Sequence, residues 1–449
     1  MEKIKNIRKR LRHQRSVRRR KLGLSTPTQI ICVSFIIVIA LGTLLLTLPI
    51  ASRHGRLDVL NAMFTATSAT CVTGLVVRDT WTQFTWFGQA VVLLLIQVGG
   101  LGLVTLTSFF ALAMRRRMGF RDLRLLGESV SADGYDQAKS VLKIVVGLAA
   151  MFEGIGILLL LFAFVPQFGL EGVWISVFTA ISAFCNAGFD LFGRFGAYSS
   201  LAPYVNNYYV QAVIMFMIIS GGLGFMVWVE LCQWYQKRRL SLHAKVVLFM
   251  SLVLTAAGTV LLKLTEDITW MGAFFTSVSA RTAGFSTFPL GSFSGAGLLT
   301  VIVLMVIGAS PGSTGGGIKT TTCYVLFEGI RSSATNTSEK AFRYAVPADA
   351  FRKAAVITLL AIGIVLSGTY ILVILEPGVP FLDALFEMSS AFGTAGLSTG
   401  ISARLCDAAK ILTILIMFIG RLGPLTIASL WYFTKGERVS YPEGNIAIG

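Results

Sequence analysis

Long apolar runs separated by polar gaps dominate the pattern of this sequence. Each run holds about 20 residues or more, the length that an α-helix needs to cross a hydrocarbon core of about 30 Å. No soluble fold requires apolar runs of this length and number. The sequence therefore predicts eight membrane helices, over Ile30–Ile50, Phe84–Met114, Ile144–Val165, Val210–Trp234, Val246–Leu264, Leu298–Leu326, Ala354–Leu375 and Ile411–Phe433.

Four shorter apolar segments lie in the gaps that follow the first, third, fifth and seventh runs. They are Asp58–Ala69, Gly172–Phe184, Thr269–Arg281 and Phe381–Phe392. An apolar segment of about 10–14 residues is too short to span a bilayer and is typical of a re-entrant element. A unit of membrane helix, half-helix, loop and membrane helix then occurs four times. We expect an all-α membrane protein in which four such M1–P-loop–M2 units surround one central pore.

The half-helices share a pattern that indicates an internal repeat. Aligned without gaps, each has a phenylalanine that is followed ten residues later by a glycine: Phe64 and Gly74, Phe178 and Gly188, Phe274 and Gly284, Phe386 and Gly396. The third copy departs from the others because Val278 stands where they have serine. We expect a basic tail over residues 1–25, followed by repeats over residues 26–125, 126–240, 241–345 and 346–449, the last including a short cytoplasmic tail.

The distribution of charge predicts the orientation in the membrane. The chain of 449 residues is 54% hydrophobic and 14% charged, and 39 Lys and Arg against 22 Asp and Glu give a net charge of +17. The basic residues gather in the first 21 positions and in the gaps after even-numbered runs. Cytoplasmic loops carry such an excess of Lys and Arg. We expect a multi-pass plasma-membrane protein with both termini cytoplasmic and no nucleic-acid partner.

The loops that follow the half-helices carry mostly small or neutral side chains. Their residues are Cys71-Val72-Thr73-Gly74, Cys185-Asn186-Ala187-Gly188, Arg281-Thr282-Ala283-Gly284 and Gly393-Thr394-Ala395-Gly396. Non-helical backbone exists at membrane depth only where it is buried in protein or lines an aqueous cavity. Glycine permits the positive φ that turns successive carbonyls toward one axis, and rings of carbonyls replace the hydration shell of a monovalent cation. The C-terminal ends of the half-helices add attraction for a cation, so we expect a selectivity filter here.

The sixth apolar run contains a break. Its residues are Gly308-Ala309-Ser310-Pro311-Gly312-Ser313-Thr314-Gly315-Gly316-Gly317-Ile318-Lys319. Each glycine costs a helix about 1 kcal/mol and each proline about 3 kcal/mol, so a continuous helix is very unfavourable. The stretch is also close to a nucleotide-binding P-loop, but Lys319 comes one position late and a membrane run precedes it, which argues against nucleotide binding.

These features resemble the Ktr/Trk/HKT potassium transporters, in particular the membrane subunit of bacterial Ktr systems. The resemblance extends from about Thr26 to the C-terminus. It rests on the four loops, on Arg281-Thr282-Ala283-Gly284-Phe285, on Phe392-Gly393-Thr394 and on Gly420-Arg421-Leu422-Gly423-Pro424. It implies that K⁺ is the transported ion and binds at the filter residues, because glycine at all four filter positions is the pattern that the family associates with K⁺ preference.

The resemblance also implies a gate and two partners. In the family, the stretch that matches the break is an intramembrane loop that closes the pore below the filter, and the arginine near the end of the chain faces the pore beside it. The gate residues would be Gly308, Ser310, Pro311, Gly312, Ser313, Thr314, Gly315, Gly316, Gly317, Lys319 and Arg421. Two chains would form a homodimer, and a separate cytosolic nucleotide-binding ring of the RCK type would dock on the basic inner face.

Several points stay open at this stage. We expect the basic tail to contact anionic membrane lipid or an acidic partner. Whether transport is channel-like or coupled, and whether Na⁺ activates it, does not follow from the sequence. Glu153 lies inside the third run, where a carboxylate is a candidate functional residue, but a structural hydrogen bond is as compatible. We interpret Gly99–Gly102 and Gly221–Gly224 as sites of close helix packing.

Two other classes of protein predict sequence patterns that differ from that of a pore. A secondary transporter of inverted repeats, with a small solute bound at the midplane, predicts two-fold rather than four-fold internal similarity, so the four equal offsets favour the pore. A membrane-bound enzyme needs a nucleophile–base pair or a metal-ligand cluster, and six dispersed cysteines and three distant histidines indicate neither. We expect an ion transporter with no catalytic residues and no nucleotide on this chain.

Overall fold

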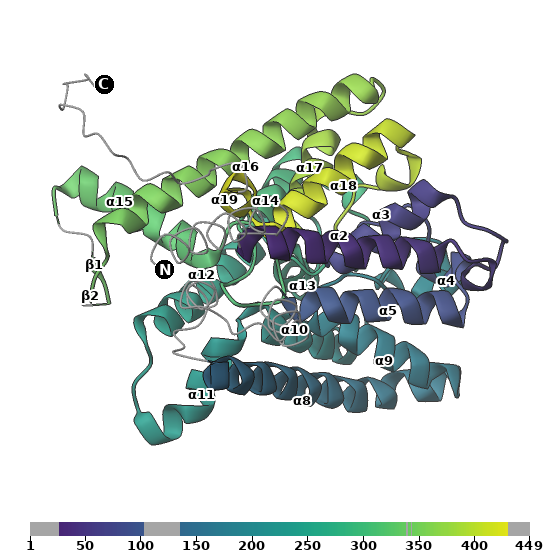
Figure 1. Ribbon diagram of the computed structural model, residues 1–449, viewed down its shortest axis with the longest axis horizontal. Coiled ribbons are helices and arrows are strands. Elements are labelled where there is room, and N and C mark those ends of the chain that lie inside the picture. The colour runs from purple at the N-terminus through teal and green to yellow at the C-terminus, as the bar shows by residue number, and fades with distance from the viewer. Residues whose placement is uncertain (1–26, 103–134, 338–339, 343, 430–449) are drawn as a thin grey trace, which may run out of the picture.

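Helices make up nearly all of the regular structure, and the longest of them run in one common direction (Figure 1). The computed structural model describes residues 27–102, 135–337, 340–342 and 344–429. The predicted basic tail, the arginine-rich gap at residues 115–124 and the C-terminal tail lie outside the described residues. Strands in the described part of the chain are limited to β1 (Lys340–Ala341) and β2 (Tyr344–Ala345), which pair antiparallel.

Four long helices begin the four predicted repeats: α2 (Pro27–Leu46), α8 (Tyr135–Phe168), α12 (Leu242–Thr265) and α16 (Ala348–Leu375). By length and composition, α8, α12 and α16 can each cross a membrane on their own. Large apolar side chains on them point away from the protein, with Phe162 76%, Leu252 71% and Leu359 70% exposed. Exposed apolar surface of this kind fits contact with lipid.

Four short helices follow the long ones: α3 (Val59–Thr70), α9 (Glu171–Phe184), α13 (Trp270–Ala280) and α17 (Phe381–Gly393). Their bounds agree within one residue at either end with the four predicted half-helices. The side chains of Asp58 and Thr269 accept hydrogen bonds from backbone N–H groups in the first turns of α3 and α13. Such N-caps satisfy donors that would otherwise be unpaired, which defines where a helix begins.

Four inner helices come next: α5 (Trp86–Gly100), α10 (Tyr208–Gly222), α14 (Gly295–Val306) and α18 (Asp407–Leu422). The prediction of continuous membrane helices over Val210–Trp234 and Ile411–Phe433 is wrong, whereas the predicted break in the sixth run is present. The run after α10 continues as α11 (Phe225–Lys237) at an angle of 99°, and α15 (Thr320–Thr335) and α19 (Pro424–Ser429) likewise follow breaks. Gly224 and Gly423 have φ of +93° and +87°, a conformation that no α-helix contains and that glycine adopts freely.

The helices pack in a closed cycle. Each short helix contacts the long helix before it and the inner helix after it. Each inner helix also contacts the short helix of the next unit: α5 packs on α9, α10 on α13, α14 on α17 and α18 on α3. The last contact joins the end of the chain to its beginning. The C-terminal ends of the four short helices are thereby brought to one region of the molecule.

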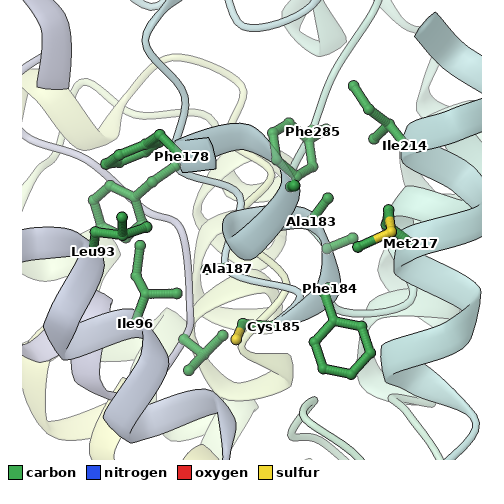
Figure 2. Close-up of a cluster of buried hydrophobic side chains, with 14 of the residues drawn as sticks. Leu93, Ile96, Phe178, Ala183, Phe184, Cys185, Ala187, Ile214, Met217 and Phe285 are labelled. Atoms are coloured by element: carbon green, nitrogen blue, oxygen red, sulfur yellow. The ribbon is translucent and has the colours of Figure 1, made fainter. Parts of the chain in front are cut away.

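The remaining elements lie in the connections between these helices. They are the short helix α4 (Thr80–Gln83) and the 3₁₀ turns η1 (Pro49–Ala51), η2 (Phe192–Phe195), η3 (Ala202–Tyr204), η4 (Leu290–Ser292) and η5 (Ser402–Arg404). The loop of the second unit is enclosed by apolar side chains. Figure 2 shows Cys185 and Ala187 beside Leu93 and Ile96 of α5, with Met217 of α10 on the opposite side.

Candidate ion-binding site

Gly74, Gly188, Gly284 and Gly396 form a ring of backbone neighbours. A Cβ added to Gly74 would lie 3.2 Å from the Cα atoms of both Gly188 and Gly396. A Cβ added to Gly284 would lie 2.9 Å from the Cα of Gly188 and 3.3 Å from that of Gly396. Side chains cannot be accommodated between backbones that approach so closely. The structure thus brings together four loops that are far apart in the sequence and explains why each has glycine at this position.

The backbone of each loop turns in the same way as it reaches the ring. The four glycines have φ between +69° and +90°. The residue two positions earlier also has positive φ, between +51° and +75°, in every loop: Val72, Asn186, Thr282 and Thr394. Residues other than glycine rarely adopt this conformation, and such backbone strain gathers at functional sites.

Carbonyl groups from the four loops converge on the ring. The oxygen of the residue before each ring glycine faces the glycine of a neighbouring loop, and these oxygens belong to Thr73, Ala187, Ala283 and Ala395. The loop side chains Cys71, Thr73 and Asn186 are neutral and fully buried. The C-terminal ends of the short helices, which carry partial negative charge, lie directly behind them. The arrangement offers a cation many neutral oxygen atoms and no carboxylate that would hold it permanently.

Arg281 is the one charged residue among the sixteen predicted filter positions, and its side chain turns away from the ring. Its guanidinium Nη2 donates to Thr255 Oγ1 on α12 at 2.7 Å. Ser277 Oγ donates to the carbonyl oxygen of the same Thr255 at 2.9 Å. Arg281 therefore ties the third loop to the helix behind it.

A serine near the end of each short helix sets the register of the loop. The N–H of the residue before each ring glycine donates to the serine carbonyl at 2.8 or 2.9 Å, and the acceptors are Ser68, Ser182, Ser279 and Ser390. The third serine is thus Ser279, and the buried phenylalanine four residues before it is Phe275. The ungapped alignment on Phe274 and Val278 is wrong by one residue, because the third loop is one residue shorter and Phe274 is 36% exposed.

Glycines on the inner helices let these helices approach the short ones. A Cβ at Gly99, Gly221 or Gly420 would collide with the carbonyl group of Thr70, Phe184 or Phe392, respectively, near the end of a short helix. This contact confirms close packing at Gly99 and Gly221. Gly224 differs, because a Cβ there would lie 2.7 Å from the carbonyl oxygen of Pro311 in the broken sixth run.

The break in the sixth run forms a loop over residues 307–319, which we call the intramembrane loop. Its N–H groups donate to two other units: Ser310 to Gly222 O at 3.2 Å, Thr314 to Gly221 O at 3.3 Å, and Gly316 to Thr394 Oγ1 at 3.0 Å. The Nζ of Lys319 donates back to Gly315 O at 2.7 Å. The loop therefore lies directly beside the end of α10 in the second unit and beside the fourth filter loop.

Arg421 connects the intramembrane loop to the first unit. It lies on α18 and is 7% exposed. Its guanidinium donates to the carbonyl oxygen of Thr314 in the loop and to that of Gly99 at the end of α5. The family resemblance alone implied that this arginine lies beside the loop, and the structure brings the two together.

Two buried carboxylates have partners that the sequence did not indicate. Gln97 Nε2 on α5 donates to both carboxylate oxygens of Glu153 at 2.9 and 3.1 Å. Glu387 on α17 is fully buried and was not identified as a candidate. The signal available in the sequence was an acidic residue inside an apolar half-helix.

Comparison with known proteins agrees with this architecture. The profile of the TrkH family, described as a cation transport protein, matches residues 4–266 and 240–434. The chain is 36% identical over 439 residues to the Ktr system potassium uptake protein B of Bacillus subtilis, covering 94% of this chain and 97% of that protein. It is 33% identical to the potassium/sodium uptake protein NtpJ of Enterococcus hirae, with coverage of 94% and 97%.

A solved structure shares the fold. The potassium transporter TrkH from Vibrio parahaemolyticus matches with a TM-score of 0.71 at 18% sequence identity, over 92% of this chain and 86% of that chain. Together with the sequence relatives, this match supports an all-helical, multi-pass membrane protein. The chain belongs to the TrkH family of cation transport proteins, within the Ktr/Trk superfamily, and is an ion transporter rather than an enzyme.

Proposed function

We propose that this chain is the membrane subunit of a potassium uptake system and moves K⁺ through a central pore. The observation that carries the proposal is the ring of Gly74, Gly188, Gly284 and Gly396 with its converging carbonyl groups. Carbonyl oxygens replace the water around a K⁺ ion without the full charges that would trap it. An anion pathway would instead need fixed cations or helix N-termini at this point.

The closed cycle of helices supports one pore made by a single chain. Each of the four units contributes a long helix, a short helix, a filter loop and an inner helix, and α18 of the last unit packs on α3 of the first. The filter would comprise the sixteen loop residues at 71–74, 185–188, 281–284 and 393–396, with K⁺ as the transported substrate. In this proposal the side chain of Arg281 stabilises its loop and does not touch the ion.

The intramembrane loop is proposed as the gate. It lies beside the end of α10 and the fourth filter loop, and Arg421 joins it to α5 through Thr314 O and Gly99 O. A buried arginine beside a cation pathway opposes the passage of cations as long as it stays there. Movement of the loop together with this arginine would open the pathway.

The names of the relatives support potassium as the substrate. Ktr system potassium uptake protein B is named for K⁺, whereas NtpJ is named for K⁺ and Na⁺. We propose K⁺ as the principal ion, and Na⁺ as a second ion that enters the site less well or activates transport. Nucleotide is proposed to bind on a partner and not on this chain.

Partners and orientation complete the proposal. A Ktr system has several components, and we propose that two copies of this chain form a homodimer to which a cytosolic nucleotide-binding ring of the RCK type is bound. Both termini are proposed to lie in the cytoplasm, with the basic residues 1–25 on anionic lipid of the plasma membrane. The positive-inside distribution of Lys and Arg supports this orientation.

Flux measurements in proteoliposomes test the proposal. Purified protein reconstituted into liposomes should carry K⁺, measured by tracer uptake, faster than Na⁺ under the same gradient. Equal fluxes of the two ions would contradict the proposed selectivity, and no cation flux from folded protein would contradict the pore. Uptake of K⁺ in cells that lack their own K⁺ uptake systems gives an independent readout.

A further inference from the structure

The four filter loops are not held in the same way. In the first unit, Ser68 Oγ accepts a hydrogen bond from the N–H of Gly74 at 3.1 Å. In the second and third units, the hydroxyls of Ser182 and Ser279 donate to the carbonyl oxygens of Phe189 and Phe285, the residues that follow the ring glycines. One serine hydroxyl thus fastens each of these three loops directly at the ring.

The fourth loop lacks this fastening. Ser390 occupies the equivalent position on α17, as its carbonyl bond to the N–H of Ala395 demonstrates. Its hydroxyl is buried and has no hydrogen-bond partner among the described residues. The fourth loop must therefore be held in some other way if it is to be as well ordered as the other three.

Glu387, one helical turn before Ser390, supplies the missing connection. Its carboxylate is fully buried, and its Oε2 accepts from Ser398 Oγ at 2.9 Å while its Oε1 accepts from Ser402 Oγ. Ser398 Oγ in turn accepts from the N–H of Gly400 at 2.9 Å. Since Ser398 is two residues beyond Gly396, these bonds hold the segment that directly follows the ring.

Glu387 is suited to this position because both of its carboxyl oxygens accept from serine hydroxyls. Two acceptor oxygens and two serine hydroxyl donors leave one orientation for each group. Hydrogen bonds to an acidic group are stronger than those between neutral groups when the group is ionised. A glutamine at the same place has the same size, but its amide nitrogen would face one hydroxyl as a donor and reverse the direction of that bond.

We propose that Glu387 is a positioning residue that holds the fourth filter loop through Ser398 and Ser402 and thereby determines how well the pore distinguishes K⁺ from Na⁺. The proposal rests on the function proposed above. Replacing the carboxylate lets Gly396 and its carbonyl neighbours shift relative to the other three loops. A filter whose oxygens are less well placed loses discrimination between ions before it loses conduction.

The test compares variants in proteoliposomes. The E387Q variant should lower the ratio of K⁺ to Na⁺ flux about tenfold, a change of about 1.4 kcal/mol. S398A and S402A should lower the flux ratio less than E387Q does. Adding S402A to E387Q should cause no further loss, because both changes break the same connection. The E266Q variant is the control, since Glu266 also accepts from a serine, with Ser294 N–H at 3.0 Å, but lies away from the ring.

Ion-dependent stability provides a second readout. An ion that binds the folded protein raises its unfolding temperature, so wild type should be stabilised more by K⁺ than by Na⁺. E387Q should lose most of this difference, whereas E266Q should keep it. A purely structural role for Glu387 would lower the unfolding temperature equally in both ions and leave the flux ratio unchanged.

The outcomes separate this inference from the proposed function. If wild type prefers K⁺ and E387Q matches E266Q in both readouts, the positioning role is wrong and the proposed function stands. If wild type does not prefer K⁺, the proposed function itself fails. If E387Q does not fold, the S398A/S402A double variant takes its place, and an unaltered flux ratio in that variant overturns the positioning role.

Discussion

The ring and the intramembrane loop are both rich in glycine, but their glycines have different functions. At the ring, a Cβ on Gly74 or Gly396 would collide with the backbone of another unit. In the intramembrane loop, Gly312 has positive φ, and a Cβ there would meet no described atom within 4 Å. Glycine therefore allows four backbones to meet in the ring, whereas at Gly312 it allows a turn with free space around it. The loop glycines Gly308, Gly315 and Gly316 are closely packed, because a Cβ there would lie 2.1 to 2.5 Å from other atoms.

The two regions also differ in how they are attached. Each filter loop is bonded to its own short helix through backbone N–H groups and, in three units, a serine hydroxyl. The intramembrane loop has bonds within its own unit, such as Ile318 N–H to Val306 O at 3.0 Å, and is attached to other units by separate bonds and by Arg421. Each filter loop is thus bonded to the helix that carries it, whereas the contacts of the intramembrane loop with other units can be released separately. Rigidity suits ion selection, and release suits gating.

The largest effect is expected from a side chain in the ring. The variants Gly74→Ser and Gly396→Ser should lower the ratio of K⁺ to Na⁺ flux by about tenfold or more, each factor of ten being about 1.4 kcal/mol, because the added atoms push the neighbouring loops apart. Tracer flux in liposomes measures the ratio. Gly55→Ser is the control, since Gly55 has φ of +88° but open space around it; unaltered selectivity in the ring variants would refute the role of these glycines.

Shortening the intramembrane loop should have the next largest effect. Deletion of part of Gly312–Gly317 should raise K⁺ flux about fivefold, because the shortened loop no longer reaches both Gly221 and Thr394. Selectivity should stay as in wild type, since the ring is untouched. An unchanged or lower flux from a folded deletion variant would remove the gate assignment.

Loss of the arginine contact should have a smaller effect of the same sign. Arg421→Gln removes the charge and weakens the bonds to Thr314 O and Gly99 O, so flux should rise about two- to threefold. Lys319→Gln is the matched comparison, because Lys319 bonds within the loop at Gly315 O. If flux rises as much in Lys319→Gln as in Arg421→Gln, then positive charge alone restrains the loop, and the connection to α5 does not.

The smallest effect is expected where glycine serves only the turn. Gly312→Ala should cost about 1 kcal/mol of stability from its positive φ and leave flux near the wild-type value. Gly316→Ala should change flux more, because its Cβ would lie 2.5 Å from Thr394 Oγ1. Equal behaviour of the two variants in thermal unfolding and flux assays would contradict the distinction drawn between them.

Some features followed directly from the order of residues. The length and polarity of the apolar segments predicted the four short helices within one residue at either end. The density of glycine and proline predicted the break in the sixth run, because its helix-breaking cost exceeds what packing can offset. Breaks after α10 and α18 escaped prediction, since one or two glycines in an apolar run are also what a tightly packed continuous helix contains.

Register and long-range partners could not be predicted in this way. Phe274 and Phe275 are adjacent residues of the same type, so the sequence does not distinguish them. Only the structure shows that Phe275 is the one that is buried in the core. Gln97 and Glu153 lie on different helices, as do Arg421 and Thr314. Such pairs are contacts between segments that are far apart in the sequence. The local pattern around one residue does not indicate which distant segment will pack against it.

The sequence by itself determined the class of protein, the number of half-helices and the neutral chemistry of their loops, because the cost of placing charge and unpaired backbone in a membrane acts on each segment separately. The tertiary structure alone decided that four glycines meet in one ring, that Arg421 contacts the intramembrane loop and that Glu387 accepts hydrogen bonds from Ser398 and Ser402. These relations arise from packing among all four units, and packing is a property of the assembled chain.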